Sequence, residues 1–162
     1  MNLQRGLRVA LVFALLVVLH FFLRPLLGWR VTVDFLLIGV LLLAVRVRPG
    51  VAALIGFATG LVADSLTPGS FGAGALAMTI VGFGASWLKA VFFADNVFLH
   101  AFFFFIGKWA FDVLYVVAER NRPVYEMASQ IALWSPLAAA LTAVCGVAVI
   151  LLFRGMLESA ST

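Results

Sequence analysis

The chain has 162 residues, of which 65% are hydrophobic and only 11% are charged, and its mean hydropathy is +1.17. Values this far from those of soluble domains indicate a single-domain, all-α integral membrane protein. The formal net charge of +4 does not indicate nucleic-acid binding, because the basic residues are scattered among the ends of apolar segments rather than gathered on one face. The single cysteine, Cys145, excludes an internal disulfide bond and a zinc site of the usual kind.

Six apolar segments are predicted to cross the membrane as a helix bundle, with expected bounds 7–27, 31–45, 49–66, 71–93, 96–118 and 128–153. The first begins like a signal peptide but lacks a small-residue cleavage site, so we expect it to be retained. The second is short for a hydrocarbon core of about 30 Å. Arg46, Arg48 and Pro49 separate it from the third, because two guanidinium groups and a helix breaker are costly at mid-bilayer.

The third and fourth segments carry glycines spaced by four or eight residues, which places these residues on one face of each helix. The third segment has Gly56 and Gly60, followed by Asp64, and the fourth has Gly74 and Gly82. Helices in lipid associate through close backbone contact, because lipid supplies no hydrophobic drive. The third and fourth segments are therefore expected to sit close together, and the same glycine faces are candidates for binding a partner helix.

The connection between these two segments is predicted to be a tight reversal, because it contains Pro68 and Gly69. Asp34 and Asp64 lie near the ends of their segments, where we expect water to reach them. Each is interpreted as a helix cap or an interface residue, and a functional carboxylate is the alternative.

The fifth segment carries a polar stripe on one helical face, formed by His100, Phe104, Lys108, Asp112 and Tyr115. A lysine or an aspartate at the centre of a membrane helix costs roughly 2.5 to 3.5 kcal/mol on insertion scales. Lys108 and Asp112 are therefore expected to face the bundle or each other, and their spacing of four allows them to pair. Two interpretations stay open: a structural pair that fixes helix register, and part of a proton or solute path.

The last connection, residues 119–126, is interpreted as a solvated loop, and Pro136 is expected to kink the sixth helix. Basic residues near the segment ends number six on one side and four on the other, which favours both termini in the cytoplasm.

Nothing in the sequence has the form of a catalytic or metal site. There is no HExxH motif and no paired-cysteine spacing, and His20 and His100 lie on different predicted helices. We therefore expect no catalytic residue, no metal and no cofactor, with an intramembrane enzyme as the disfavoured alternative.

A family resemblance covers roughly residues 31–90. It is carried by Asp34 within DFLLI, by Arg46 and Arg48-Pro49-Gly50, by Gly56, Gly60 and Asp64 of GxxxGLxxD, and by Pro68-Gly69-Ser70-Phe71-Gly72. This pattern resembles the rod shape-determining protein MreD family of bacteria, and the GLxxD with its following proline and glycine is the most specific part. Val33 departs from the family, whose members often have proline before this aspartate.

The resemblance implies a non-enzymatic scaffold of the rod complex, or elongasome, in the bacterial inner membrane, where it helps to maintain rod shape through lateral peptidoglycan synthesis. The implied partners are the transmembrane helix of MreC, the MreB filament, RodA and a class B penicillin-binding protein, and the helix faces would also allow a homodimer. The implied fold is similar to the six-helix substrate-binding subunits of energy-coupling-factor transporters.

The alternative is a substrate-capture subunit of such a vitamin transporter. The first segment has a small-residue stripe that resembles the docking stripe of those subunits, at Gly6, Ala10 and Ala14. Those subunits also need a pocket lined by tryptophan and polar side chains. The four tryptophans here show no convergence in the sequence, and interfacial anchoring accounts for some of them.

Overall fold

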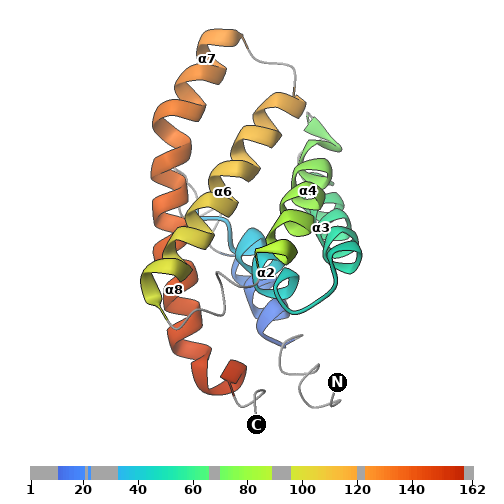
Figure 1. Cartoon of the computed structure of the whole chain (residues 1–162). Helices are drawn as coiled ribbons and strands as arrows, with labels where there is room; N and C mark the ends of the chain where they lie inside the picture. The colour runs from blue at the N-terminus through green and yellow to red at the C-terminus, as the bar shows by residue number, and fades with distance from the viewer. Residues whose placement is uncertain are drawn as a thin grey trace.

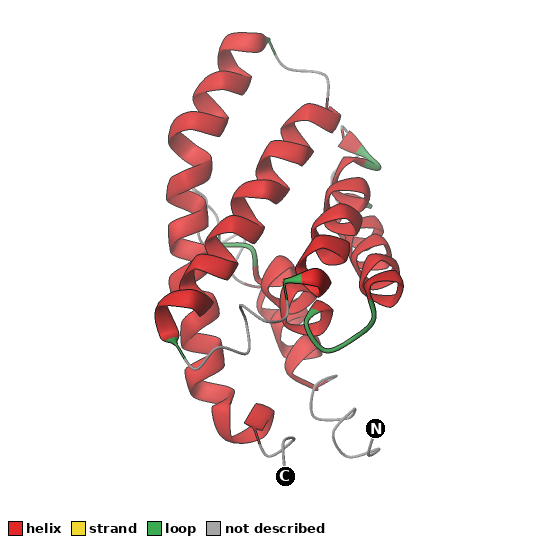
Figure 2. Cartoon of the chain, viewed as in Figure 1, coloured by secondary structure: helices red, strands yellow, loops and turns green. Residues whose placement is uncertain are grey.

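The computed structural model describes residues 11–20, 22, 33–65, 70–88, 96–119 and 123–158, and within them every regular element is helical (Figure 1; Figure 2). After an N-terminal helix, Leu11–His20, the elements in chain order are α2 (Phe35–Ala44), α3 (Pro49–Asp64), α4 (Ala73–Trp87), α6 (Val97–Glu119), α7 (Val124–Ser129), the π-helical turn η2 (Gln130–Trp134) and α8 (Ser135–Glu158). Pro68 and Gly69 lie outside the described residues, as do Gly6, Ala10 and most of the basic residues used to predict orientation.

The short helix α2 lies at the centre of the bundle and contacts α3, α4, α6 and α8. Nine of its ten residues are buried. A helix that is apolar on every side is stable only when every side is covered. Around it, α3 packs mainly on α4, and α6 packs mainly on α8, so two helix pairs enclose the central helix (Figure 1).

Two predicted boundaries are corrected by local capping. The helix predicted from residue 31 begins at Phe35, because the Asp34 side chain accepts a hydrogen bond from the Leu37 amide at 3.1 Å and acts as its N-cap. The helix predicted from residue 71 begins at Ala73, after Gly72 in a left-handed conformation with φ of 96°. The bounds of α3 and α6 lie within two residues of those predicted.

The C-terminal elements form one continuous rod beside α6 (Figure 1). The rod begins at Val124, so the solvated loop predicted for residues 119–126 is shorter than expected. Instead of a simple kink, a π-helical turn ends two residues before Pro136. Proline has no amide to donate and its ring crowds the carbonyl four residues earlier, and the wider π-helical spacing relieves both problems.

Large apolar side chains are exposed on all the long helices, among them Leu54, Phe83, Phe98 and Leu152. Exposure on this scale is unusual for a protein in water and suits an apolar solvent. Two helical stretches, Val97–Glu119 and Tyr125–Leu152, are long and apolar enough to cross a membrane. These features support a membrane location.

Candidate functional site

The small-residue faces of α3 and α4 pack against each other. A Cβ atom at Gly56 would overlap the Met78 carbonyl group, and one at Gly60 would overlap the backbone of Ala75. A Cβ atom at Gly82 would lie 2.8 Å from the carbonyl oxygen of Ala52 on α3, which is also too close. The expected close packing of these two segments is confirmed. Because the faces are occupied inside the chain, the expectation that they could receive a partner is corrected.

Asp64 caps the start of α4 from the end of α3. Its carboxylate accepts hydrogen bonds from the amides of Gly72 at 2.9 Å, Gly74 at 3.2 Å and Ala75 at 2.9 Å. A Cβ atom at Gly74 would overlap this carboxylate. Asp64 is only 2% exposed, so the prediction that water reaches it is wrong, while its interpretation as a helix cap is confirmed.

The reversal between α3 and α4 is also tied to α6. The hydroxyl groups of Ser70 and Tyr115 lie 2.6 Å apart and share a hydrogen bond. Tyr115, the last residue of the predicted polar stripe, therefore holds the turn against the next helix.

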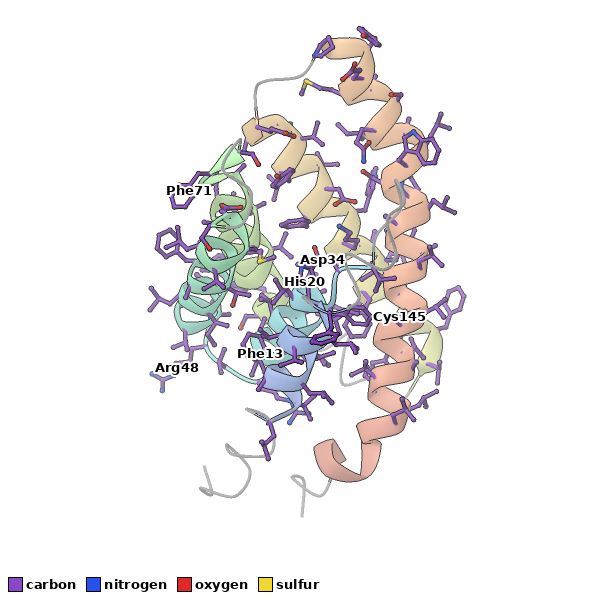
Figure 3. The ribbon with its side chains drawn as sticks, turned by 180° about the vertical axis from the view of Figure 1, so that it is seen from behind. Phe13, His20, Asp34, Arg48, Phe71 and Cys145 are labelled. Atoms are coloured by element: carbon purple, nitrogen blue, oxygen red, sulfur yellow. The ribbon has the colours of Figure 1, made fainter. Side chains whose placement is uncertain are left out.

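Four ionisable side chains from three elements form a row inside the bundle, here called the charged row: His20 and Lys108, which are buried, and Asp34 and Asp112, which are partly buried. Lys108 Nζ lies 2.6 Å from Asp112 Oδ1 and 3.6 Å from Asp34 Oδ2. His20 Nδ1 lies 3.7 Å from Asp34 Oδ1, and Figure 3 shows both side chains meeting at the centre of the bundle. The pairing of Lys108 with Asp112 is as the spacing predicted, whereas sequence reasoning missed that Asp34 and His20 join them.

The surroundings of the charged row are closed by α8 and by an aromatic ring. Lys108 is 5% exposed, and its ammonium group lies 4.9 Å from the centre of the Phe111 ring, within the range of a cation–π contact. Thr142 on α8 is fully buried and accepts a hydrogen bond from the Asp34 amide at 3.4 Å. Ser135, also fully buried, lies close to Asp112, although within the described residues its hydroxyl has no partner in good hydrogen-bond geometry.

His100 belongs to a different part of α6. It stands eight residues before Lys108, about 12 Å along the helix axis, so it lies outside the charged row. Among the described residues, no group of three histidine, cysteine or acidic side chains is arranged to hold a metal ion.

An apolar groove of about 280 Å³ lies between α4 and α6, with α2 beneath it. Small residues stand on both walls, Gly84 and Ala85 on α4 and Gly107 and Ala110 on α6. A Cβ atom at Gly84 would meet nothing within 4 Å, so the space beside it is open. The full lining is Leu41, Ile80, Val81, Gly84, Ala85, Leu88, Phe102, Phe103, Ile106, Gly107, Ala110 and Leu114.

Comparison of the chain with family models, with curated proteins and with solved structures found no match. The class of protein is therefore defined by its own features: an all-helical apolar bundle with a charged row inside it and an apolar groove between two helices. The resemblance to the MreD family rests on the motif residues alone.

Proposed function

We propose that this protein is a multi-pass membrane scaffold that binds one transmembrane helix of a partner in the groove between α4 and α6. The observation that carries the proposal is the groove, whose lining is apolar throughout and whose walls both contain small residues. In lipid, small residues promote helix association because they let backbones approach closely. The lining residues fall within 80–88, from α4 and its C-cap residue, and within 102–114 of α6. These stretches span about 12 and 18 Å, enough for two to three turns of a docked helix.

The multi-pass arrangement is supported by the apolar surface and by the helix lengths. We propose six crossings, as expected from the apolar segments. The 16 residues of α3 and the 15 of α4 span about 24 and 22 Å, which a locally thinned bilayer can accommodate. The described start of the N-terminal helix and the end of α8 lie toward the same end of the bundle, as an even number of crossings requires (Figure 1). We assign that end to the cytoplasm.

The proposed setting is the bacterial rod complex, in which this chain would act as a non-enzymatic MreD-like component of the inner membrane. MreC would supply the docked helix, and MreB, RodA and a class B penicillin-binding protein would be the wider partners. The supporting motif has a physical explanation in this chain. The aspartate of GLxxD, Asp64, accepts a hydrogen bond from the amide of Gly72, the N-cap residue of α4, whose positive φ favours glycine.

The vitamin-transporter alternative gains no support from the site. Such a subunit needs polar groups and tryptophans that converge on a ligand. Among the described tryptophans, Trp87 and Trp109 are 72% and 40% exposed, and none lines the groove.

The test fills the groove without disturbing the fold. Gly84→Leu adds a side chain where a Cβ atom meets nothing, and replacing glycine within a helix also favours the helix. Gly50→Leu is the matched control, because its Cβ position is equally open and lies at the start of α3, away from the groove. We expect Gly84→Leu to lower co-purification with co-expressed MreC by about tenfold, a loss of about 1.4 kcal/mol in binding, and Gly50→Leu to leave it unchanged.

A second groove variant, Ala110→Leu on the α6 wall, should weaken binding in the same way. Unchanged binding by both groove variants, with both still folded, would reject the groove as the docking site. If the folded wild-type protein does not bind MreC at all, the assignment to the rod complex is wrong.

A further inference from the structure

The charged row has an unbalanced charge when His20 is neutral. Its two carboxylates, Asp34 and Asp112, stand against one ammonium group, that of Lys108. A protonated His20 would complete a row of alternating sign, because its Nδ1 atom lies 3.7 Å from the Asp34 carboxylate. An uncompensated charge buried in an apolar bundle is costly, whereas a balanced row is far less so.

His20 is also the point where the N-terminal helix meets the rest of the bundle. That helix runs antiparallel along α2, with Phe13 against Gly39 and His20 beside the Asp34 cap. The groups that face the His20 end are Asp34 from α2 and, beyond it, Lys108 and Asp112 from α6. Within the described residues, α8 contributes the uncharged hydroxyls of Ser135 and Thr142, and Arg46 lies near the opposite end of the N-terminal helix.

We propose that the charged row is a proton-binding site: His20 takes up one proton when the N-terminal helix packs on α2, and this proton holds the helix in place. The only covalent bond formed in this step is the N–H bond between the proton and the His20 imidazole. This proposed proton site is independent of the groove between α4 and α6, since no residue of the charged row lines that groove.

The direction of the pH dependence follows from linkage. Above about pH 6.5 a histidine exposed to water is mostly neutral, so the packed state would bind more protons than the detached state. A state that binds more protons loses stability as the pH rises, so packing of the N-terminal helix should weaken with increasing pH. If packing takes up one proton, the equilibrium constant between the packed and the detached helix can change by at most about tenfold per pH unit.

The experiment measures alkylation of single cysteines by N-ethylmaleimide in the purified full chain, in a Cys145→Ala background. Leu16→Cys places the thiol at a side chain that is 2% exposed, and Leu11→Cys places it at one that is 56% exposed on the same helix. The rate at Leu16→Cys divided by that at Leu11→Cys removes the dependence of thiolate formation on pH. Val12→Cys provides a second buried reporter in case Leu16→Cys does not fold.

We expect this ratio to rise at least tenfold between pH 6 and pH 9 in the otherwise wild-type chain. Asp112→Asn balances the row without a proton, so it should keep the ratio low and flat. His20→Gln should raise the ratio at every pH and remove its pH dependence. His100→Gln, a histidine outside the charged row, should leave the profile unchanged.

A flat ratio in the wild-type background, or an unchanged profile in His20→Gln, would overturn the proposal. If His100→Gln changes the pH profile, the proton is taken up by His100 rather than by His20, and this result would also overturn the proposal. Titration with NaCl at fixed pH separates a proton from a metal cation: a ratio that follows sodium rather than pH would show that the row binds a cation instead.

Discussion

The carboxylate of Asp64, at the end of α3, accepts a hydrogen bond of 2.9 Å from the backbone amide of Ala75 in the first turn of α4. The same side chain binds two more amides, those of Gly72 and Gly74. One buried carboxylate therefore satisfies donors at the start of α4 that have no partner within the helix. It also joins the two helices whose glycine faces pack most closely.

Replacing Asp64 should destabilise the hairpin of α3 and α4. Asp64→Asn removes the negative charge and puts an amide donor where an acceptor is needed, so the free energy of unfolding should fall by about 2 to 3 kcal/mol. Denaturant titration of the purified protein in detergent measures this. Glu126→Gln, at an exposed carboxylate, is the control and should change stability by no more than about 0.5 kcal/mol. Equal effects of the two variants would contradict the capping role.

Adding one methyl group at Gly60 should be as damaging as removing a core side chain. The Cβ atom of Gly60→Ala would overlap the backbone of Ala75, which cannot rotate away, and we expect a loss of about 3 kcal/mol. Gly50→Ala has open space at the same atom and should be neutral, or stabilising by up to about 1 kcal/mol. Melting temperatures of the Gly60→Ala and Gly50→Ala variants, each compared with the wild-type protein, measure the two effects. A tolerated Gly60→Ala would mean that α3 and α4 are not in close contact.

Removing the ammonium group from the charged row should cost more than removing the whole pair. Lys108→Met leaves the Asp34 and Asp112 carboxylates facing each other in the bundle, with an expected loss of about 3 to 5 kcal/mol. Lys108→Met combined with Asp112→Asn should be more stable than Lys108→Met alone, because one buried charge has gone. Additive effects in this double-mutant cycle, measured by denaturant titration, would show that the groups do not interact.

The contact between Ser70 and Tyr115 should contribute as a single hydrogen bond. Tyr115→Phe and Ser70→Ala should each lower the free energy of unfolding by about 1 kcal/mol, and the double variant should lose no more than either alone. Tyr125→Phe, at an exposed hydroxyl, serves as the control. A double variant that loses the sum of the two would contradict a shared bond.

Features that depend on neighbours along one helix could be predicted from the sequence. The bounds of α3 and α6 follow from Pro49 at the start of one helix and from a long apolar run in the other. The spacing of four between Lys108 and Asp112 brings the two side chains together on any α-helix. The same periodicity placed Gly56 and Gly60 on one face.

Apart from the packing of α3 on α4, which helix faces meet was decided only by the tertiary structure. The central helix α2 is apolar on every side, so its sequence contains no preferred face and no sign that it would be enclosed. Asp34 and His20 reach Lys108 through contacts between elements distant in sequence, and the glycine faces proved to be internal while the groove formed elsewhere. Periodicity identifies the faces of a single helix, but in an apolar chain the choice of partner depends on how all the helices fit together, because apolar character no longer distinguishes inside from outside.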